Sequence, residues 1–206
     1  MNFSRISLIL PLLLFILSGF LIAHYFYNDT RLPISQIQTK QQHSLIKKLM
    51  PLEYDNDLIN DKIELASLGD LGSANPVPVY RARNKNLPQG IVIFPLAPNG
   101  YNGLIQLAIS LDYAGTILEI KVLGHNETPG FGDAIDQNVS DWLKRFVGSS
   151  HAYTDEDKIL NVDHISGATI SSNAVIKAVE KCLAFYNREK EKIWAMPVPD
   201  QSVTKP

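Results

Sequence analysis

The chain has very little cysteine and no excess of basic residues. Its 206 residues include one cysteine, Cys182, so it cannot form an internal disulfide, a four-cysteine zinc site or an iron-sulfur cluster of its own. Lys and Arg total 19 against 21 Asp and Glu, and the net charge of -2 argues against the broad basic surface that nucleic-acid binding requires. Redox chemistry in this protein would therefore need an organic cofactor.

Charged residues are also missing from residues 6–28, which read ISLILPLLLFILSGFLIAHYFYN. An apolar helix of about 20 residues, rising ~1.5 Å per residue, spans a hydrocarbon layer roughly 30 Å thick. A cleaved signal peptide is the alternative, but no clear small-x-small cleavage site lies between Gly19 and Thr30. Arg5 precedes the segment, so the positive-inside rule places the N-terminus in the cytoplasm. We predict an uncut single-pass anchor that holds the rest of the chain outside.

The composition along the chain predicts four regions. Residues 1–28 are a cytoplasmic stub and transmembrane anchor, and residues 29–75 are a juxtamembrane linker with a helical part, ending in irregular surface over 58–75. Residues 76–196 form the folded domain. Residues 197–206 have no hydrophobic periodicity and are expected to be a flexible tail.

Within the folded region, four segments rich in β-branched or aliphatic residues are separated by Gly, Pro and Asn, which predicts β-strands. They are Val77–Arg83, Gly90–Leu96, Leu104–Asp112 and Thr116–Gly124. The last two are expected to form a hairpin, with Leu118, Ile120 and Val122 sharing one face of its second strand. We therefore expect an α+β fold built on an antiparallel sheet.

Two amphipathic helices are predicted to pack on this sheet. Apolar residues between Ile135 and Phe146 recur at helical spacing, and Asp133 is placed to cap that helix. The second helix is predicted from about Asn173 to Lys192. Its expected buried face carries Val175, Ile176, Val179, Cys182, Leu183 and Tyr186.

The segment before the second helix, Asp163 to Ser172, reads DHISGATISS and contains four hydroxyl side chains. Free amide groups and the helix dipole make a helix N-terminus a favourable phosphate site. Ser, Thr and Asn are also the usual helix caps, and spacing alone favours simple capping over phosphate binding.

Several motifs carry a family resemblance. Residues 163–169, DHISGAT, are similar to the flavinylation motif D-x-x-[ST]-G-A-T of FMN-binding domains. Residues 98–103, PNGYNG, and residues 125–133, HNETPGFGD, are similar to a P-x-G-Y-x-G turn and an H-x-E-T-P-G-x-G-D loop, and S-D-W follows at residues 140–142. In this order, behind an N-terminal anchor, the motifs resemble the G subunits of Rnf (Rsx) ion-translocating electron-transport complexes.

The resemblance implies a covalently bound FMN. Thr169 would carry it through a phosphoester bond, which makes the chain a phosphoprotein, and Ser166, Gly167 and Ala168 would border the cofactor. Asp163 would be recognised by a separate exported flavin transferase. Ser171 and Ser172 are rival acceptors on chemistry alone, and helix capping is the role expected for both.

The same resemblance assigns further cofactor contacts. Glu127 and Thr128 would offer an acceptor and a donor to a polar cofactor edge, and Gly130 would permit close backbone approach. Tyr101 would either lie against the flavin or fill the sheet edge. Neither His125 nor His164 has further ligands at metal-binding spacing, so no metal site is expected.

The family further implies a single-pass protein of the bacterial cell inner membrane, with its flavin domain on the periplasmic side. There it would pass electrons among the other subunits of a translocase complex that couples electron transport to ion transport, without independent turnover. Two alternatives remain: the C-type flavin subunit of a sodium-pumping NADH:quinone oxidoreductase, and a cofactor-free membrane-anchored scaffold. A serine hydrolase is a poor fit because the chain has no G-x-S-x-G motif.

Overall fold

The structure is a computed structural model that describes residues 17–20, 41–66, 69–150, 160 and 162–198. The chain divides into two compact units, Met1–Leu45 and Ile46–Pro206. None of the helices within the described residues is both long and apolar enough to cross a membrane. Apart from residues 17–20, which are helical, the predicted anchor lies outside the described residues.

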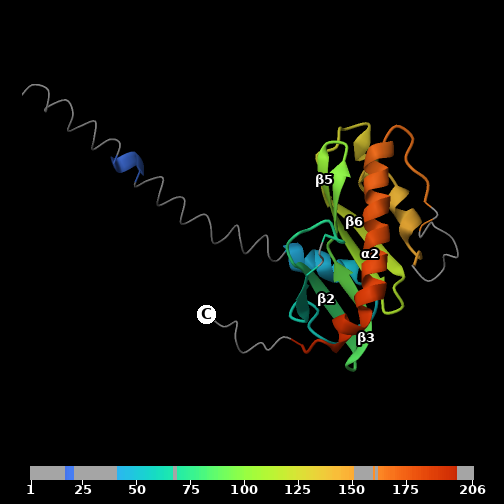
Figure 1. The fold of residues 1–206 in the computed structure, drawn as a ribbon. Helices are drawn as coiled ribbons and strands as arrows, with labels where there is room; N and C mark the ends of the chain where they lie inside the picture. Colours follow the sequence, from blue (N-terminus) through green and yellow to red (C-terminus); the bar gives the residue numbers. More distant parts are fainter. Residues whose placement is uncertain (1–16, 21–40, 67–68, 151–159, 161, 199–206) are drawn as a thin grey trace, which may run out of the picture. The chain divides into compact units, whose positions relative to one another are not determined.

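A six-stranded antiparallel sheet forms the centre of the second unit (Figure 1). Its strands are β1 (Lys62–Leu65), β2 (Val77–Asn84), β3 (Leu87–Ile93), β4 (Leu96–Gly100), β5 (Gly103–Asp112) and β6 (Ile117–Gly124). The order is β1-β2-β3-β5, and β3 and β4 pair with successive halves of β5 while β6 pairs along its opposite edge. The predicted α+β fold with an antiparallel sheet is confirmed.

The prediction of a single strand over Gly90–Leu96 is wrong. Strand β3 ends at Ile93, and β4 begins at Leu96 and pairs with the first half of β5. Pro95 lies between the two strands and has no N–H to donate to a ladder, which explains the break. The expectation of irregular surface over residues 58–75 is also partly wrong, because β1 pairs there with β2.

The predicted β5–β6 hairpin is confirmed, and its register shifts at two points, between Gln106 and Leu107 and between Ser110 and Leu111. A bulge between Ser110 and Leu111 shifts the pairing so that Ile117 lies opposite Leu111. Ile117, Ile120 and Val122 are buried, whereas Leu118 is only half-buried. The placement of Leu118 on the core face is therefore wrong.

The predicted helix over residues 135–146 is wrong as well. Two short 3-10 helices, η1 (Gly132–Ile135) and η2 (Trp142–Phe146), replace it, and Asp133 makes no cap hydrogen bond. The Asp136 carboxylate accepts from the backbone N–H of Asn138, and the Ser140 hydroxyl donates to the carbonyl of Ala134. Such local side-chain bonds compete with helical ones, which explains the interruption.

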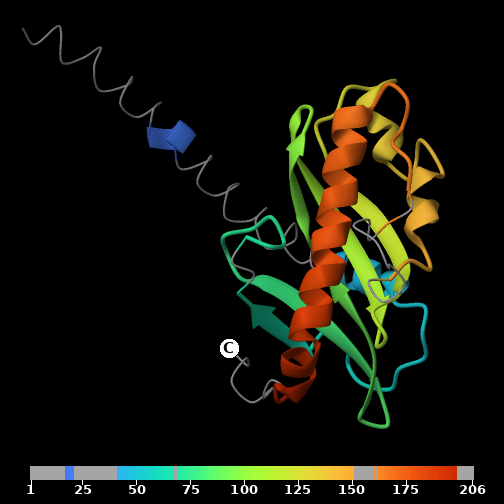
Figure 2. The same cartoon turned by 45° about the vertical axis from the view of Figure 1, so that its right-hand side comes forward.

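The long helix α2 (Thr169–Ala195) crosses one face of the sheet (Figures 1 and 2). All six residues of its predicted apolar face are buried, and they pack into one core with the inward side chains of β5 and β6. The helix starts four residues earlier than predicted. Ser171 and Ser172 therefore lie inside its first turn, and the prediction that they cap it is wrong.

Arg81 holds the C-terminal end of α2 against the sheet. This arginine of β2 is fully buried and donates to the carbonyls of Ile193, Met196 and Pro197 at 2.8, 2.8 and 3.1 Å. Its Nε donates to the Asp61 carboxylate at 2.7 Å. Burial lowers the pKa of the Arg81 guanidinium, and the hydrogen bond to Asp61 opposes that shift.

Candidate functional site

A cavity of about 490 Å³ lies beside the N-terminal end of α2. Three segments converge there: the turn between β4 and β5, the loop after β6, and the first turn of the helix (Figures 1 and 2). The lining residues are Tyr101, Glu127, Thr128, Phe131, Gly132, Gly167, Ala168, Thr169, Ile170 and Ser171. Its volume lies within the ~300–1,000 Å³ typical of small-molecule sites.

The first turn of α2 presents backbone donors at this cavity. Ala168 is the N-cap residue and makes no side-chain cap hydrogen bond. The amide of Ser172 is the first to bond back, to the carbonyl of Ala168 at 2.9 Å. By helix geometry the amides of Thr169, Ile170 and Ser171 have no partner within the helix. This end therefore favours an anion such as a phosphate.

The structure separates the four hydroxyls of this segment. Ser171 is buried and donates to Glu127 Oε2 at 2.7 Å, and Ser172 is buried and donates to the carbonyl of Ala168 at 2.8 Å. Ser166 is exposed but lines a different cavity. Thr169 is exposed and lines the 490 Å³ cavity. Of the four, Thr169 alone has a hydroxyl that is both accessible and on that cavity.

Glu127 connects the three segments of the cavity wall. Its side chain is buried, with a relative exposure of 4%. Oε1 accepts from the backbone N–H of Asn102 at 3.2 Å, and Oε2 accepts from Ser171. Next to it, the side-chain amide Nδ2 of Asn102 donates to Thr128 Oγ1 at 3.0 Å. The loop after β6 is thus joined to both the β4–β5 turn and α2.

Two glycines make room for this carboxylate. A Cβ atom on Gly132 would lie 2.7 Å from Glu127 Oε2, and one on Gly100 would lie 2.6 Å from Oε1. At Gly132 a side chain would require displacement of Glu127, whereas at Gly100 the new Cβ would also lie 2.4 Å from the carbonyl oxygen of Gly103. The glycines are therefore part of how the buried carboxylate is accommodated.

His125 fixes the start of the same loop. Its Nδ1 accepts from the backbone N–H of Glu127 at 3.1 Å. Nε2 faces the Asp136 carboxylate at 3.5 Å. The histidine thus ties the Glu127 backbone to the segment that follows η1.

Exposed apolar side chains surround the cavity. Tyr101, Phe131 and Ile170 have relative exposures of 67%, 68% and 53%, and all three line it. Apolar rings with free faces suit a planar aromatic ligand. Phe131, Gly132 and Ile170 were not among the predicted site residues. The HNETPGFGD motif contains the first two, and motif membership is the signal that would have included them.

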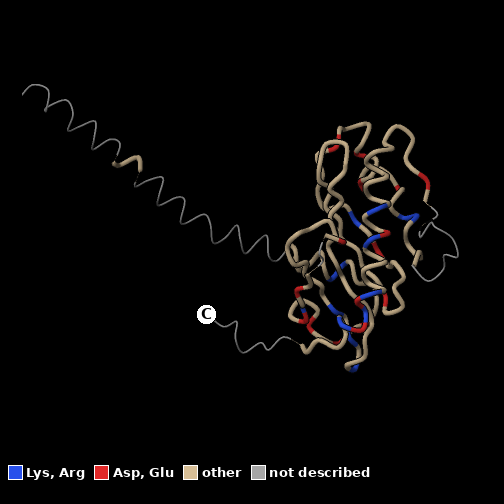
Figure 3. The backbone as a smooth tube through the Cα atoms, in the orientation of Figure 1, with Lys and Arg blue, Asp and Glu red and all other residues tan. Residues whose placement is uncertain are grey.

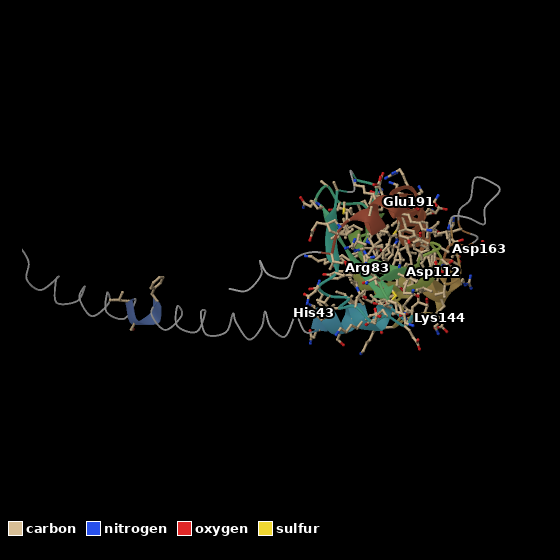
Figure 4. All side chains as sticks on the ribbon, turned by 90° about the horizontal axis from the view of Figure 1, so that it is seen from below. His43, Arg83, Asp112, Lys144, Asp163 and Glu191 are labelled. Carbon is tan, nitrogen blue, oxygen red and sulfur yellow. The ribbon has the colours of Figure 1, made fainter. Side chains whose placement is uncertain are left out.

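Three predicted site residues lie away from this cavity. Gly130 lies in the adjoining turn but does not line it. Ser166 borders a second cavity of about 380 Å³ together with Trp142 and His164. Asp163 is exposed at the edge of the domain (Figure 4), and its carbonyl accepts from Trp142 Nε1 at 2.8 Å. The other predicted residues, Tyr101, Glu127, Thr128, Gly167, Ala168 and Thr169, are brought together around one cavity.

Among the residues that the structure describes, the charge and metal-ligand patterns indicate no second centre (Figure 3). Acidic and basic residues are interspersed along the chain (Figure 3). Within the described ranges, no three His, Cys, Asp or Glu residues gather as a metal site would require. Cys182 is fully buried, and burial raises the pKa of its thiol to about 12. That cysteine is a core residue rather than a reactive one.

Comparison with known proteins gives consistent matches. Residues 100–184 match the FMN-binding domain family. The chain is 33% identical over 184 residues to the G subunit of the ion-translocating oxidoreductase complex of Vibrio atlanticus, covering 86% of each chain. It is 34% identical over 202 residues to the protein of the same name from Pseudoalteromonas atlantica, covering 93% of this chain and 92% of that one.

Among solved structures, the crystal structure of Shewanella oneidensis NqrC is similar with a TM-score of 0.47 and 21% sequence identity. That match covers 69% of this chain and 76% of the other. A likeness of this degree carries no argument about function.

Proposed function

The chain belongs to the family of G subunits of ion-translocating oxidoreductase complexes, and on this premise we propose that it is an electron-transfer protein carrying FMN in the cavity beside α2. We further propose that the FMN is attached covalently through its phosphate to Thr169. The observation that carries this proposal is the position of the Thr169 hydroxyl, which is exposed on the cavity at the uncapped start of a 27-residue helix.

The chemistry of attachment fits this position. The bond between Thr169 Oγ1 and phosphorus would form as the bond between phosphorus and the leaving nucleotide of an activated flavin nucleotide breaks, and the hydroxyl proton would pass to a base of the transferase. The free amides of Ile170 and Ser171 stabilise the phosphodiester anion that results. The separate flavin transferase that the family implies would catalyse this step and would recognise the exposed Asp163.

The residues of the cavity fit FMN. The bound cofactor supplies reversible one- and two-electron chemistry. Tyr101 and Phe131 offer aromatic surface to the planar ring system, and Thr128 offers a polar contact. Attachment through phosphate leaves the ring system unmodified, and a covalent bond prevents loss of the cofactor outside the cytoplasm.

We also propose the cellular setting. The uncharged residues 6–28 support a single-pass anchor in the bacterial inner membrane, and Arg5 supports a periplasmic position for the flavin domain. There the protein would exchange electrons with other subunits of an ion-translocating complex. Ion transport would belong to the complex rather than to this chain.

The test is flavin attachment in matched variants. The full chain is produced together with a flavin transferase, and covalent flavin is measured by fluorescence after denaturing electrophoresis. Thr169→Ala should abolish the fluorescence, whereas Thr169→Ser, which keeps a hydroxyl, should retain part of it. Ser149→Ala is the control, because that hydroxyl residue lies outside the D-x-x-[ST]-G-A-T motif and does not line the cavity, and it should stay fluorescent. A dark wild-type band would favour a cofactor-free scaffold, and a fluorescent Thr169→Ala band would move the attachment to another residue.

A further inference from the structure

We propose that the buried negative charge of Glu127 lowers the reduction potential of the flavin. This inference rests on the proposed function, because it requires FMN in the cavity. It differs from a simple cofactor contact, since the structure engages both carboxylate oxygens with the protein itself.

The Glu127 carboxylate lies in a buried environment beside the cavity. Glu127 is 4% exposed and lines the same cavity as Thr169. Its Oε1 accepts from the backbone N–H of Asn102, and its Oε2 accepts from the Ser171 hydroxyl. Within the part of the chain that the structure describes, no Lys, Arg or His lies within ion-pair distance of it. The charge is therefore held by neutral donors.

Burial of the Glu127 carboxylate has a cost in folding free energy. A buried charge without a cation is unfavourable for folding, and a Cβ atom at Gly132 would lie 2.7 Å from Glu127 Oε2, so the carboxylate also restricts that position to glycine. A glutamine at this position has an oxygen and an NH2 group that can reach the same two partners, the Asn102 backbone N–H and the Ser171 hydroxyl. These contacts therefore do not explain why the side chain is charged. A ligand in the neighbouring cavity would be close enough to feel that charge.

We expect the Glu127 charge to act on the flavin electrostatically. Reduction adds electrons to the flavin, and a fixed negative charge in a poorly solvated wall opposes that addition. Removal of the charge should raise the equilibrium constant for reduction. A purely mechanical role for Glu127 predicts no such direction.

The experiment separates charge from mechanical support. Midpoint potentials of the covalently flavinylated full chain are measured at fixed pH for Glu127→Gln and Ser171→Ala. Glu127→Gln removes the charge and keeps groups that can reach Asn102 and Ser171. Ser171→Ala removes one of these contacts and keeps the charge. Glu119→Gln is the matched control, because that side chain on β6 is 42% exposed and is not a lining residue of the cavity.

We expect Glu127→Gln to raise the equilibrium constant for two-electron reduction at least tenfold, which is about 30 mV at 29.6 mV per tenfold change. Glu119→Gln should leave it unchanged, and Ser171→Ala should leave it unchanged or lower it. An unchanged or lower constant in Glu127→Gln would overturn the proposal, as would equal increases in Glu127→Gln and Ser171→Ala.

Loading with flavin is checked first. If the wild-type chain carries no flavin, the proposed function fails before this inference is reached. If only Glu127→Gln fails to load, Glu127→Asp decides the matter, because it keeps the charge. A loaded Glu127→Asp protein with a potential near the wild-type value supports a requirement for the charge, and an unloaded one contradicts it.

Discussion

The two ends of α2 treat their unpaired backbone groups in opposite ways. At the C-terminal end, the fully buried Arg81 donates to three carbonyls, those of Ile193, Met196 and Pro197. At the N-terminal end, Ala168 provides no side-chain cap and Thr169 faces a cavity. At the C-terminal end, backbone carbonyls are hydrogen-bonded by a side chain of the protein. At the N-terminal end, backbone N–H groups remain available to hydrogen-bond a phosphate.

The same contrast holds for the two buried carboxylates near these ends. Asp61 is 2% exposed and is paired with Arg81 and Arg83. Glu127 is 4% exposed and has only neutral donors. The Asp61 carboxylate is thus paired with arginines near the C-terminal end of α2. The Glu127 carboxylate has neutral partners beside the cavity, where its charge can act on a ligand.

The largest expected effect is at the structural end. Arg81→Met leaves Asp61 with one cation and the carbonyls of Ile193, Met196 and Pro197 without their donor, so it should lower the free energy of unfolding by about 3–5 kcal/mol. Urea denaturation followed by tryptophan fluorescence measures the change. Arg188→Met is the control, because that exposed arginine pairs with Asp70 at the surface, and its loss should be much smaller. Equal losses in the two variants would contradict the importance of the buried contacts.

A smaller loss is expected at the cavity. Gly132→Ala places a Cβ atom 2.7 Å from Glu127 Oε2, so the carboxylate must move. We expect a loss of about 1–3 kcal/mol in unfolding free energy and reduced flavin attachment. Gly124→Ala is the matched control, because the nearest atom to its new Cβ is 3.6 Å away. Normal flavin attachment in Gly132→Ala would show that the position of Glu127 is not critical.

The smallest effect concerns the middle of α2. Burial raises the pKa of Cys182 from 9.0 to about 12, so the unfolded state loses its proton first as the pH rises. Stability from this group is complete below pH 9 and is lost between pH 9 and about 12, by about 1 kcal/mol at pH 10. Cys182→Ala should flatten the fall in unfolding free energy over this range. Some slope should remain, because the pKa of Tyr186 is also raised to about 12 by burial. An unchanged slope would contradict the predicted coupling.

Local patterns in the sequence predicted much of the fold. The β-branched and aliphatic composition of β5 and the apolar spacing of α2 predicted both elements, because each contributes side chains to the same core. The 3-10 helices could not be predicted in this way, since the side-chain bonds of Asp136 and Ser140 override the apolar spacing. The start of α2 was misjudged because its hydroxyl residues resemble caps but make their bonds from within the helix.

The site shows the same limit. Motif resemblance selected Thr169 and Glu127, but not what holds Glu127, because Asn102 and Ser171 lie 25 and 44 residues away from it in the chain. The role of Arg81 could not be predicted from the sequence for a similar reason, because the carbonyls that it binds lie 112 to 116 residues away in the chain. Long-range contacts of single polar side chains leave no periodic signal in a sequence.

The central claim is that the hydroxyl at the start of α2 carries the cofactor. Its most direct test is peptide-mapping mass spectrometry of the full wild-type chain from cells that contain a flavin transferase. We predict that the peptide containing Thr169 carries the mass of FMN less one water, with fragment ions that assign it to Thr169. An unmodified Thr169, with or without flavin elsewhere in the chain, would contradict the claim.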